Sequence, residues 1–320
     1  MVIRIPNWLG DALMATPVYY NLCMREKIYL FGPPAIVNLF KSFPNTEIIY
    51  YEKGNIKKNL ETLKPFKNEV GLLLTNSFSS AWLFFRAGLR QRWGYARDFR
   101  SFLLTRAVKP PKKKLHQRDY YLYLIEKLGF PADFRDLYLP LKEETLNKVK
   151  NVFLKSFQEK PFIVLAPGAA YGPAKMWPKE YYKDLAHLLL KLGFAVIVVG
   201  TSKEKDIGDF IKNGKKEIYN FCGKTNLTEV AGILSFAKAV ISNDSGLMHL
   251  AAALKIPQIA IFGSTDPEAT GPLNPKAIVL KKDLPCSPCF KRTCKYGHYK
   301  CLKDITPEEV LENIHKILSI

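Results

Sequence analysis

Short apolar segments alternate with longer helical patterns along almost the whole chain, and this alternation limits the folds that are open to it. In the first half we read the apolar segments as strands at Val2–Ile5, Ile28–Phe31, Glu47–Tyr51, Val70–Leu74 and Arg92–Tyr95. The series starts again with Phe162–Ala166, Ala195–Gly200, Glu217–Tyr219, Ala239–Ser242, Gln258–Phe262 and Ala277–Leu280. Helices are predicted near residues 11–25, 33–41, 56–65, 77–88, 117–128, 142–156, 178–192, 203–213, 226–236, 245–254 and 307–319. Alternating strands and helices form parallel sheets covered by helices. The pattern therefore predicts an α/β protein with two doubly wound, Rossmann-like domains facing a central cleft.

The length of 320 residues is sufficient for two domains of ordinary size. We expect an N-terminal domain over residues 1–157 and a C-terminal domain over residues 158–305, with a cysteine-rich segment at 286–301. A final helix over residues 306–320 is predicted to pack back on the N-terminal domain. No apolar stretch is continuous enough to span a membrane, and the first residues lack the apolar core of a signal peptide. The sequence therefore predicts a soluble, cytoplasmic protein.

The segment after the apolar strand Ala239–Ser242 is the clearest candidate binding site. Several of its residues are of types that begin helices or allow a ligand to approach the backbone. They are Asp244, Ser245, Gly246, Leu247 and His249. Free N–H groups and the positive end of the helix dipole would attract a phosphate or diphosphate there. An ordinary capped helix needs the same residue types, so that alternative stays open.

Asp11 follows the first strand and precedes a helix. Ligands of α/β proteins bind at the carboxyl ends of the strands, where this carboxylate is expected to lie. It could take a proton from a substrate hydroxyl as a general base. Capping of the following helix is the structural alternative.

A second loop with candidate binding residues follows the strand Phe162–Ala166. It contains Gly168, Ala169 and Lys175, whose backbone N–H groups and ammonium group could neutralise a departing diphosphate. The loop lacks the glycine and lysine spacing of a P-loop. Thr201 and Glu204 follow the next strand, where contacts to a ribose or a base are expected.

The net charge of +19 is concentrated in one tract. Its basic residues are Arg86, Arg90, Arg92, Arg97, Arg100, Arg106, Lys109, Lys112, Lys113, Lys114 and Arg118. Such a field attracts nucleic acid, an anionic membrane surface or an acidic glycolipid, although a solvated basic surface without a partner is also consistent with it. No recognisable nucleic-acid-binding module accompanies the tract, so an anionic acceptor at a membrane is favoured.

Four of the six cysteines are clustered at Cys286, Cys289, Cys294 and Cys301. A Cys-x-x-Cys pair can present two thiolates to one ion, so a structural Zn²⁺ is a hypothesis here, with His298 as a spare ligand. An iron–sulfur cluster, disulfides and free thiols are the alternatives. The cluster lies outside the candidate ligand loops, and we expect no catalytic role for it.

Four motifs, taken together, resemble the ADP-heptose:lipopolysaccharide heptosyltransferases of glycosyltransferase family 9, and most closely those of the heptosyltransferase II type. The motifs are Asn7-Trp8-Leu9-Gly10-Asp11, Thr75-Asn76-Ser77-Phe78, Gly172-Pro173-Ala174-Lys175-Met176-Trp177-Pro178 and residues 243–254. The resemblance extends from the first strand to the start of the last helix. It implies a GT-B fold and an inverting transfer of L-glycero-D-manno-heptose from ADP-heptose to an inner-core heptose.

The resemblance also implies roles for individual residues. Asp11 would be the base, and Lys175 and the helix start at Asp244–Gly246 would stabilise the ADP leaving group, with His249 beside them. The implied contacts to the acceptor are Asn7, Asn76 and Ser77. Relatives often carry an acidic residue where this chain has Ala170, which leaves the sugar contacts at that position undefined. No catalytic metal or other cofactor is implied.

The implied acceptor is an acidic lipopolysaccharide precursor at the inner face of the inner membrane. The protein would then be a peripheral membrane enzyme and a monomer, and nucleic acid would not be a partner. Three alternatives stay open: heptosyltransferase I or another member of the family with a different acceptor or sugar, a sugar-nucleotide epimerase of similar architecture, and a basic, metal-stapled nucleic-acid-binding protein.

Overall fold

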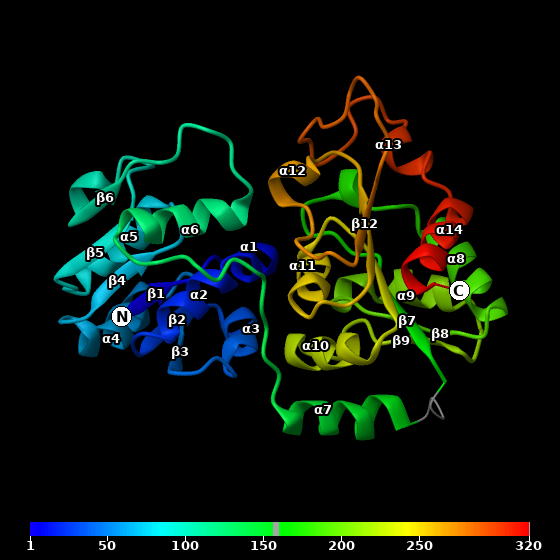
Figure 1. Cartoon of the computed structure of the whole chain (residues 1–320), viewed down its shortest axis with the longest axis horizontal. Coiled ribbons are helices and arrows are strands. Elements are labelled where there is room, and N and C mark those ends of the chain that lie inside the picture. The colour runs from blue at the N-terminus through cyan, green and yellow to red at the C-terminus, as the bar shows by residue number, and fades with distance from the viewer. Residues whose placement is uncertain (156–159, 320) are drawn as a thin grey trace. The chain divides into compact units, whose positions relative to one another are not determined.

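The computed structural model describes residues 1–155 and 160–319, and the chain divides into two compact units, Met1–Pro140 and Leu141–Ile320. Each unit contains one six-stranded sheet whose strands pair in parallel, with helices between successive strands (Figure 1). The predicted α/β class with two doubly wound sheets is confirmed. Within the described residues, no helix is both long and apolar enough to cross a bilayer.

The sheet of unit 1 has the strand order β3-β2-β1-β4-β5-β6. Its strands are β1 (Val2–Arg4), β2 (Ile28–Gly32), β3 (Thr46–Tyr50), β4 (Val70–Leu73), β5 (Gln91–Tyr95) and β6 (Arg106–Val108). The central strand β1 is buried, and its Ile3 pairs with Leu30 on one side and Leu72 on the other. Strand β6 was not predicted, because it is a three-residue edge strand whose first two residues are exposed, so it carries no apolar signal.

The helices of unit 1 lie between its strands, except α6, which follows β6. They are α1 (Leu9–Met14), α2 (Thr16–Cys23), α3 (Pro34–Val37), α4 (Ile56–Leu63), α5 (Phe78–Arg86) and α6 (Gln117–Lys127), with short 3₁₀ helices η1 (Asn38–Phe40), η2 (Lys64–Phe66) and η3 (Ser101–Leu103). The helix predicted near residues 11–25 is divided into α1 and α2. Pro17 lies in the first turn of α2, where its missing N–H group is tolerated but would interrupt a continuous helix.

The sheet of unit 2 has the strand order β12-β11-β10-β7-β8-β9. Its strands are β7 (Phe162–Ala166), β8 (Ala195–Val198), β9 (Ile218–Asn220), β10 (Ala239–Asn243), β11 (Gln258–Phe262) and β12 (Ala277–Lys281). Side chains alternate between its two faces. Ile259 and Ile261 of β11 belong to the main core of this unit, whereas Ala260 and Phe262 pack with Met248.

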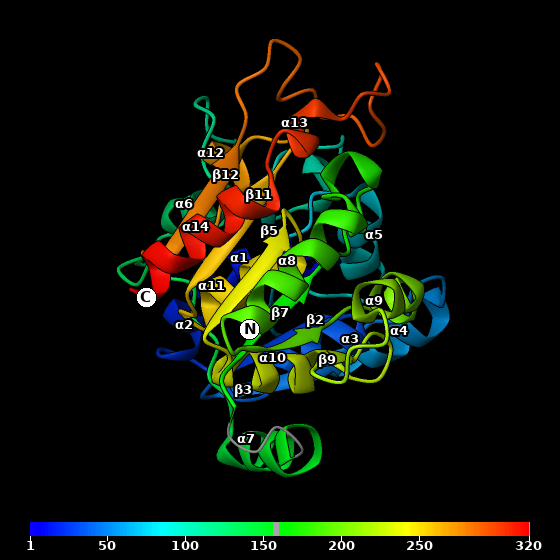
Figure 2. The same ribbon diagram turned by 90° about the vertical axis from the view of Figure 1, so that its right-hand side faces the viewer.

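The helices of unit 2 cover both faces of this sheet. They are α7 (Glu143–Val149), α8 (Lys179–Lys191), α9 (Lys205–Lys212), α10 (Leu227–Phe236), α11 (Gly246–Ala253), α12 (Pro267–Thr270), α13 (Lys300–Lys303) and α14 (Pro307–Leu318), with the short helical turns η4 (Lys150–Leu154), η6 (Pro173–Lys175) and η7 (Ser202–Glu204). Helices α8 and α14 lie side by side on one face of the sheet (Figure 2).

The division of the chain differs from the predicted one in two respects. Helix α7 belongs to unit 2, where Val149 packs against Gly232 of α10 and Lys148 pairs with Glu229, so the boundary falls after Pro140. The predicted boundary at residue 157 lies outside the described residues. The final helix α14 was expected on the N-terminal domain, but its Val310 and Ile314 are part of the core of unit 2.

Candidate active site

Both sheets have a topological switch point, and the predicted site residues gather at these two points. In unit 1 the chain runs from β1 to β2 and β3 on one side and then returns to β4 on the other. In unit 2 it runs from β7 to β8 and β9 and then returns to β10. Ligands of open α/β sheets bind at the carboxyl ends of the strands at such points. The loops after β1 and β4, and those after β7 and β10, are therefore the candidate ligand loops.

In unit 2, Lys175 and Asp244 come together from two of these loops. The Lys175 ammonium Nζ lies 2.5 Å from Asp244 Oδ2, and the Thr265 hydroxyl donates a hydrogen bond of 2.6 Å to the same oxygen. The side chains of Lys175 and Asp244 are 13% and 5% exposed. A lysine ammonium carries three donor hydrogens, so this pairing leaves further donors on Lys175. Asp244 thus holds a positive charge in place at the switch point.

The loop after β7 is fastened to β10 by Asn243, the first residue of the motif 243–254. Asn243 is fully buried, and its amide Nδ2 donates to the backbone oxygen of Pro167 at 2.7 Å. Its Oδ1 accepts from the backbone N–H of Trp177 at 3.0 Å and from the Tyr182 hydroxyl at 3.1 Å. One side chain therefore fixes both ends of the loop that carries Lys175. The motif included Asn243 without this role, and its place at the end of a buried strand was the signal for it.

Helix α11 begins at the predicted phosphate-binding turn. Ser245 is its N-cap residue, yet the Ser245 side chain makes no capping hydrogen bond. Its buried Oγ has no hydrogen-bond partner among the described residues. Gly246 and Leu247 form the first turn, and His249 is buried one turn further along. The simple capped-helix alternative therefore does not explain Ser245.

Gly168 and Ala169 are half-buried and follow the end of β7. A methyl group added at Gly168 would lie 3.0 Å from the side-chain carbons of Glu204, so the glycine allows this close approach. The Glu204 carboxylate accepts hydrogen bonds from the backbone N–H and the hydroxyl of Thr201, at 2.7 and 2.6 Å. Thr201 and Glu204 thus form a capping box for η7 at the carboxyl edge of the sheet.

In unit 1, Asp11 is the third residue of α1, whose N-cap is Trp8. Asp11 is therefore in the first turn and not at the cap position. Burial raises the pKa of Tyr121 well above its ordinary value, and the negative charge of Asp11 raises it further; Tyr19 is affected by the same two causes. Asp11 accordingly lies near two buried phenols at the carboxyl edge of the sheet.

The loop before Asp11 is held by Arg4, which the sequence analysis did not single out. Arg4 is buried at the end of β1, and its guanidinium group donates to the backbone oxygen of Ile5 and to Asn7 Oδ1, both at 2.6 Å. It also lies 4.0 Å from the centre of the Tyr51 ring. Burial lowers the pKa of Arg4 to about 10. An arginine within an otherwise apolar strand was the available sequence signal.

The second ligand loop of unit 1 carries Asn76 and Ser77. The Asn76 amide donates to the Tyr120 hydroxyl at 3.2 Å, and its buried Oδ1 has no hydrogen-bond partner within the described part of the chain. Ser77 is exposed and caps α5 by accepting from the backbone N–H of Ser80. The Ser77 hydroxyl oxygen is therefore used in the helix cap, whereas the side-chain oxygen of Asn76 is a buried acceptor whose hydrogen bond is not satisfied within the described residues.

Arg100 was counted in the basic tract, but it is 0% exposed and contributes no open surface charge. Its guanidinium group donates to the backbone oxygens of Thr75 at 2.5 Å and Tyr95 at 3.1 Å. Burial lowers the pKa of Arg100 to about 10. Arg100 is therefore not part of the exposed basic surface. It holds together the loops after β4 and β5.

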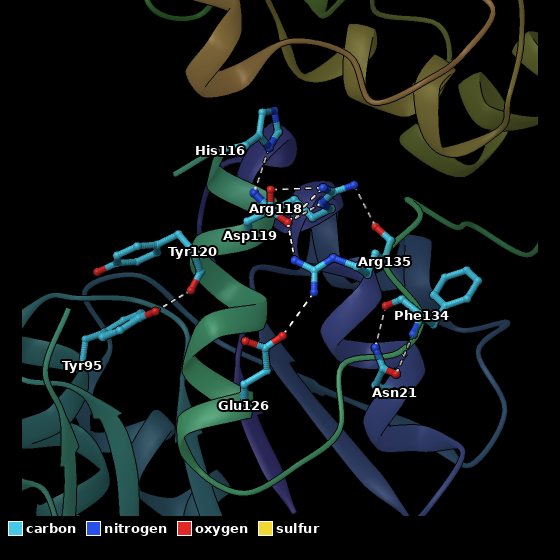
Figure 3. Close-up of polar contacts among 9 residues, drawn as sticks. All are labelled: Asn21, Tyr95, His116, Arg118, Asp119, Tyr120, Glu126, Phe134 and Arg135. Carbon is cyan, nitrogen blue, oxygen red and sulfur yellow. Dashed lines mark hydrogen bonds and ion pairs between the residues drawn. The ribbon is translucent and has the colours of Figure 1, made fainter. Parts of the chain in front are cut away.

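Helix α6 contacts the loop of Asn76 through the Tyr120 hydroxyl. Hydrogen bonds and ion pairs hold this helix along its length (Figure 3). His116 caps the helix by accepting from the backbone N–H of Arg118. The Tyr95 hydroxyl donates to the backbone oxygen of Tyr120, and the two rings stack with their centres 4.3 Å apart. Further contacts join Asp119 to Arg118 and Arg135, Arg135 to Glu126, and Asn21 to Phe134.

The four clustered cysteines are free thiols. Cys286, Cys289, Cys294 and Cys301 line one cavity of about 220 Å³ together with His298. Among the described residues, however, no group of three or more His, Cys, Asp or Glu side chains is arranged to hold a metal ion. The predicted structural zinc is therefore not supported, because the thiols share a cavity without converging on one point.

Comparison with known proteins agrees with this architecture. Residues 57–300 match the model of glycosyltransferase family 9 (heptosyltransferase). The chain is 32% identical to lipooligosaccharide heptosyltransferase 2 of Campylobacter jejuni over 98% of both chains, and 31% identical to lipopolysaccharide heptosyltransferase 2 of Escherichia coli over 98% of this chain and 97% of that one. It superposes on the structure of E. coli ADP-heptose lipopolysaccharide heptosyltransferase II with a TM-score of 0.86 and 29% identity, covering 99% of this chain and 98% of the other.

Two doubly wound units with ligand loops at their switch points define a glycosyltransferase of the GT-B fold. The chain belongs to glycosyltransferase family 9, the heptosyltransferase family. The resemblance to the heptosyltransferase II type that the motifs predicted is confirmed by these relatives.

Proposed function

We propose that this enzyme transfers L-glycero-D-manno-heptose from ADP-heptose onto the inner-core heptose of a lipopolysaccharide precursor, as a heptosyltransferase of type II. The observation that carries the proposal is the Lys175 ammonium group, which Asp244 holds at the switch point of unit 2. In unit 1, the Asp11 carboxylate lies in the first turn of α1, at the carboxyl end of β1. Near-full-length similarity to heptosyltransferases 2 supports the choice of donor and acceptor.

In the proposed reaction Asp11 accepts the proton of the acceptor hydroxyl while that oxygen attacks the anomeric carbon of the donor. A carbon–oxygen bond forms on one face of the sugar as the bond to the diphosphate breaks on the other, so the configuration inverts and ADP departs. Asn7 and Asn76 are suited to orient the acceptor, since both lie beside Asp11's switch point. Ser77 is proposed to contact the acceptor through its exposed hydroxyl group, which also caps α5.

The departing ADP needs positive charge that is already in place. Lys175, oriented by Asp244, supplies an ammonium group, and the start of α11 at Ser245 and Gly246 supplies N–H groups and the positive end of a helix dipole. We propose that these groups make a divalent cation unnecessary for catalysis. The remaining proposed donor contacts are Leu247, His249, Gly168, Ala169, Thr201 and Glu204.

The acceptor is anchored in a membrane, and we propose that the enzyme acts as a monomer at the cytoplasmic face of the inner membrane. Exposed basic side chains of unit 1, such as Arg97, Lys112 and Lys113, support this placement because they would attract anionic lipid and the acidic acceptor. Nucleic acid is not proposed as a partner.

The test is transfer from ADP-heptose to two lipopolysaccharide precursors, one that already carries a single heptose and one that carries none. Transfer to the heptosylated precursor, unchanged when a chelator is added, is the expected result. Transfer only to the precursor that carries no heptose would make the enzyme a heptosyltransferase of type I. No transfer to either precursor would overturn the proposed donor or acceptor.

A further inference from the structure

Unit 1 carries exposed aromatic rings at the same sheet edge as Asp11. Phe99 is 96% exposed and Phe102 is 76% exposed, both in the loop after β5. Phe78, at the start of α5 after β4, is 42% exposed, and its ring centre lies 6.1 Å from that of Phe102. Because all strands of this sheet are parallel, the ends of β4 and β5 meet at one edge. We call Phe78, Phe99 and Phe102 the aromatic tip.

The backbone directs the aromatic tip outward at a conformational cost. Asp98 and Phe99 have φ angles of 50° and 54°, in the left-handed region that bulky residues rarely adopt. A ring that is almost completely exposed gives no compensating burial within the fold. Strain at an exposed, apolar loop is the kind of feature that accompanies binding of a partner.

The base of the tip is fixed, so the exposed rings are held in position. Leu103 and Leu104 anchor the loop in the core of unit 1. The buried Arg100 guanidinium group ties the loop to Thr75, and a methyl group on Gly94 would approach that guanidinium group to 3.1 Å. The loop therefore presents its rings on a rigid support.

Exposed basic residues lie in the segments that follow β5 and β6 at this edge. Arg97 lies in the loop after β5, and Lys109, Lys112 and Lys113 are in the segment after β6, which runs above α6 in Figure 1. Asp98 is the acidic residue within the tip loop. Aromatic rings favour the interface between lipid and water, and each lysine or arginine near an anionic leaflet adds about 1 kcal/mol of attraction. The chemistry of this edge therefore matches an anionic lipid bilayer.

We propose that the aromatic tip inserts into the interface of an anionic bilayer and thereby presents the lipid-anchored acceptor to the loop of Asp11. The inference rests on the proposed function, because the acceptor is taken to be held in that bilayer. Asn76 and Ser77 directly precede Phe78, so one ring of the tip lies next to two of the proposed acceptor contacts. Insertion at this edge would bring the headgroup of a membrane-bound acceptor to the switch point of unit 1.

The experiment measures binding of the full-length enzyme to vesicles of phosphatidylethanolamine and phosphatidylglycerol, with phosphatidylcholine vesicles as the neutral comparison. The variant Phe99→Ser/Phe102→Ser is expected to bind the anionic vesicles at least about tenfold more weakly than the wild type. The matched control, Phe85→Ser, removes an exposed ring of unit 1 near the C-terminal end of α5, at the opposite end of that helix from Phe78, and should bind like the wild type. Equal binding by all three proteins would overturn the proposal.

Two further measurements separate insertion from a general effect on folding or catalysis. The emission that Phe99→Trp adds to that of the four native tryptophans, obtained as the difference from the wild type, should shift to the blue when anionic vesicles are added, and the absence of a shift would contradict insertion. Transfer to a deacylated, water-soluble acceptor should be unchanged in Phe99→Ser/Phe102→Ser, whereas an equal loss on this acceptor would overturn the proposal. If the wild type transfers to no acceptor but its vesicle binding depends on the tip, the proposed function fails while the membrane surface stands.

Discussion

The stability losses from removing Lys175 and Asp244 should not add, because each charge is held in place by the other. In the variant Asp244→Ala, the Lys175 ammonium group loses its partner in a site where its side chain is only 13% exposed. The loss of one member of a buried pair costs about 3 kcal/mol of unfolding free energy. Lys175→Met should cost about 1 to 2 kcal/mol, because Asp244 keeps its hydrogen bond from Thr265.

The double variant Lys175→Met/Asp244→Ala should then cost about 1 to 3 kcal/mol less than the sum of the two single losses, since neither charge is left behind. Trp177 is buried in unit 2, so in a background where the other three tryptophans are replaced by phenylalanine its fluorescence reports the unfolding of this unit. Urea titrations of the four proteins give the coupling energy. Losses that add within about 0.5 kcal/mol would refute the view that the two charges depend on each other.

Three further predictions concern local features. Gly168→Val should weaken ADP-heptose binding about tenfold in calorimetry by pushing Glu204 away, and unchanged affinity would show that the close approach at 3.0 Å is not needed. Burial would raise the pKa of the Cys294 thiol, but backbone N–H donors outweigh this effect, so the pKa lies below its ordinary value. Burial raises the pKa of Cys222 to about 12. Iodoacetamide at neutral pH should therefore label Cys294 much faster than Cys222, and equal rates by mass spectrometry would contradict this. Burial alone would raise the pKa of Glu229, yet its lysine partner and helix cap lower it, so its stabilisation is present at neutral pH and is lost as pH falls through its folded pKa. Glu229→Gln should thus cost about 1 kcal/mol at pH 7 and nothing at strongly acidic pH, and a cost independent of pH would disprove the ionic origin.

The sequence predicted every strand of the two sheets except the exposed edge strand β6, and most helices, because buried parallel strands leave apolar runs in the sequence. It also placed Asp11 after a strand of unit 1, and Lys175 and Asp244 after strands of unit 2. In the structure, each of these strand ends lies at the switch point of its own sheet. Their location follows from topology alone, since parallel strands bring all their carboxyl ends to one edge.

The features that were missed depend on contacts between distant parts of the chain. Arg100 and Asn243 each hold a loop that lies far from them in sequence, and no local pattern records such a partner. Arg4 holds the neighbouring Asn7, but its guanidinium group also lies against the rings of Phe31 and Tyr51 from other strands and loops. The division of the chain was displaced for the same reason, because α7 is assigned to unit 2 by its packing on α10. For the cysteines, spacing gave the possible ligands but could not show whether the thiols converge.

The central claim is that Asp11 acts as the base while donor binding depends on unit 2. The most direct test is single-turnover transfer by Asp11→Asn, with ADP-heptose binding measured on the same protein and Asp133→Asn, at an exposed aspartate of the same unit, as the matched control. The account predicts that Asp11→Asn lowers the transfer rate by about 10³-fold while its affinity for ADP-heptose stays within about twofold of the wild type. The control should transfer heptose at the wild-type rate. Transfer by Asp11→Asn at a rate near that of the wild type, or an equal loss of donor binding, would contradict the proposed role of Asp11.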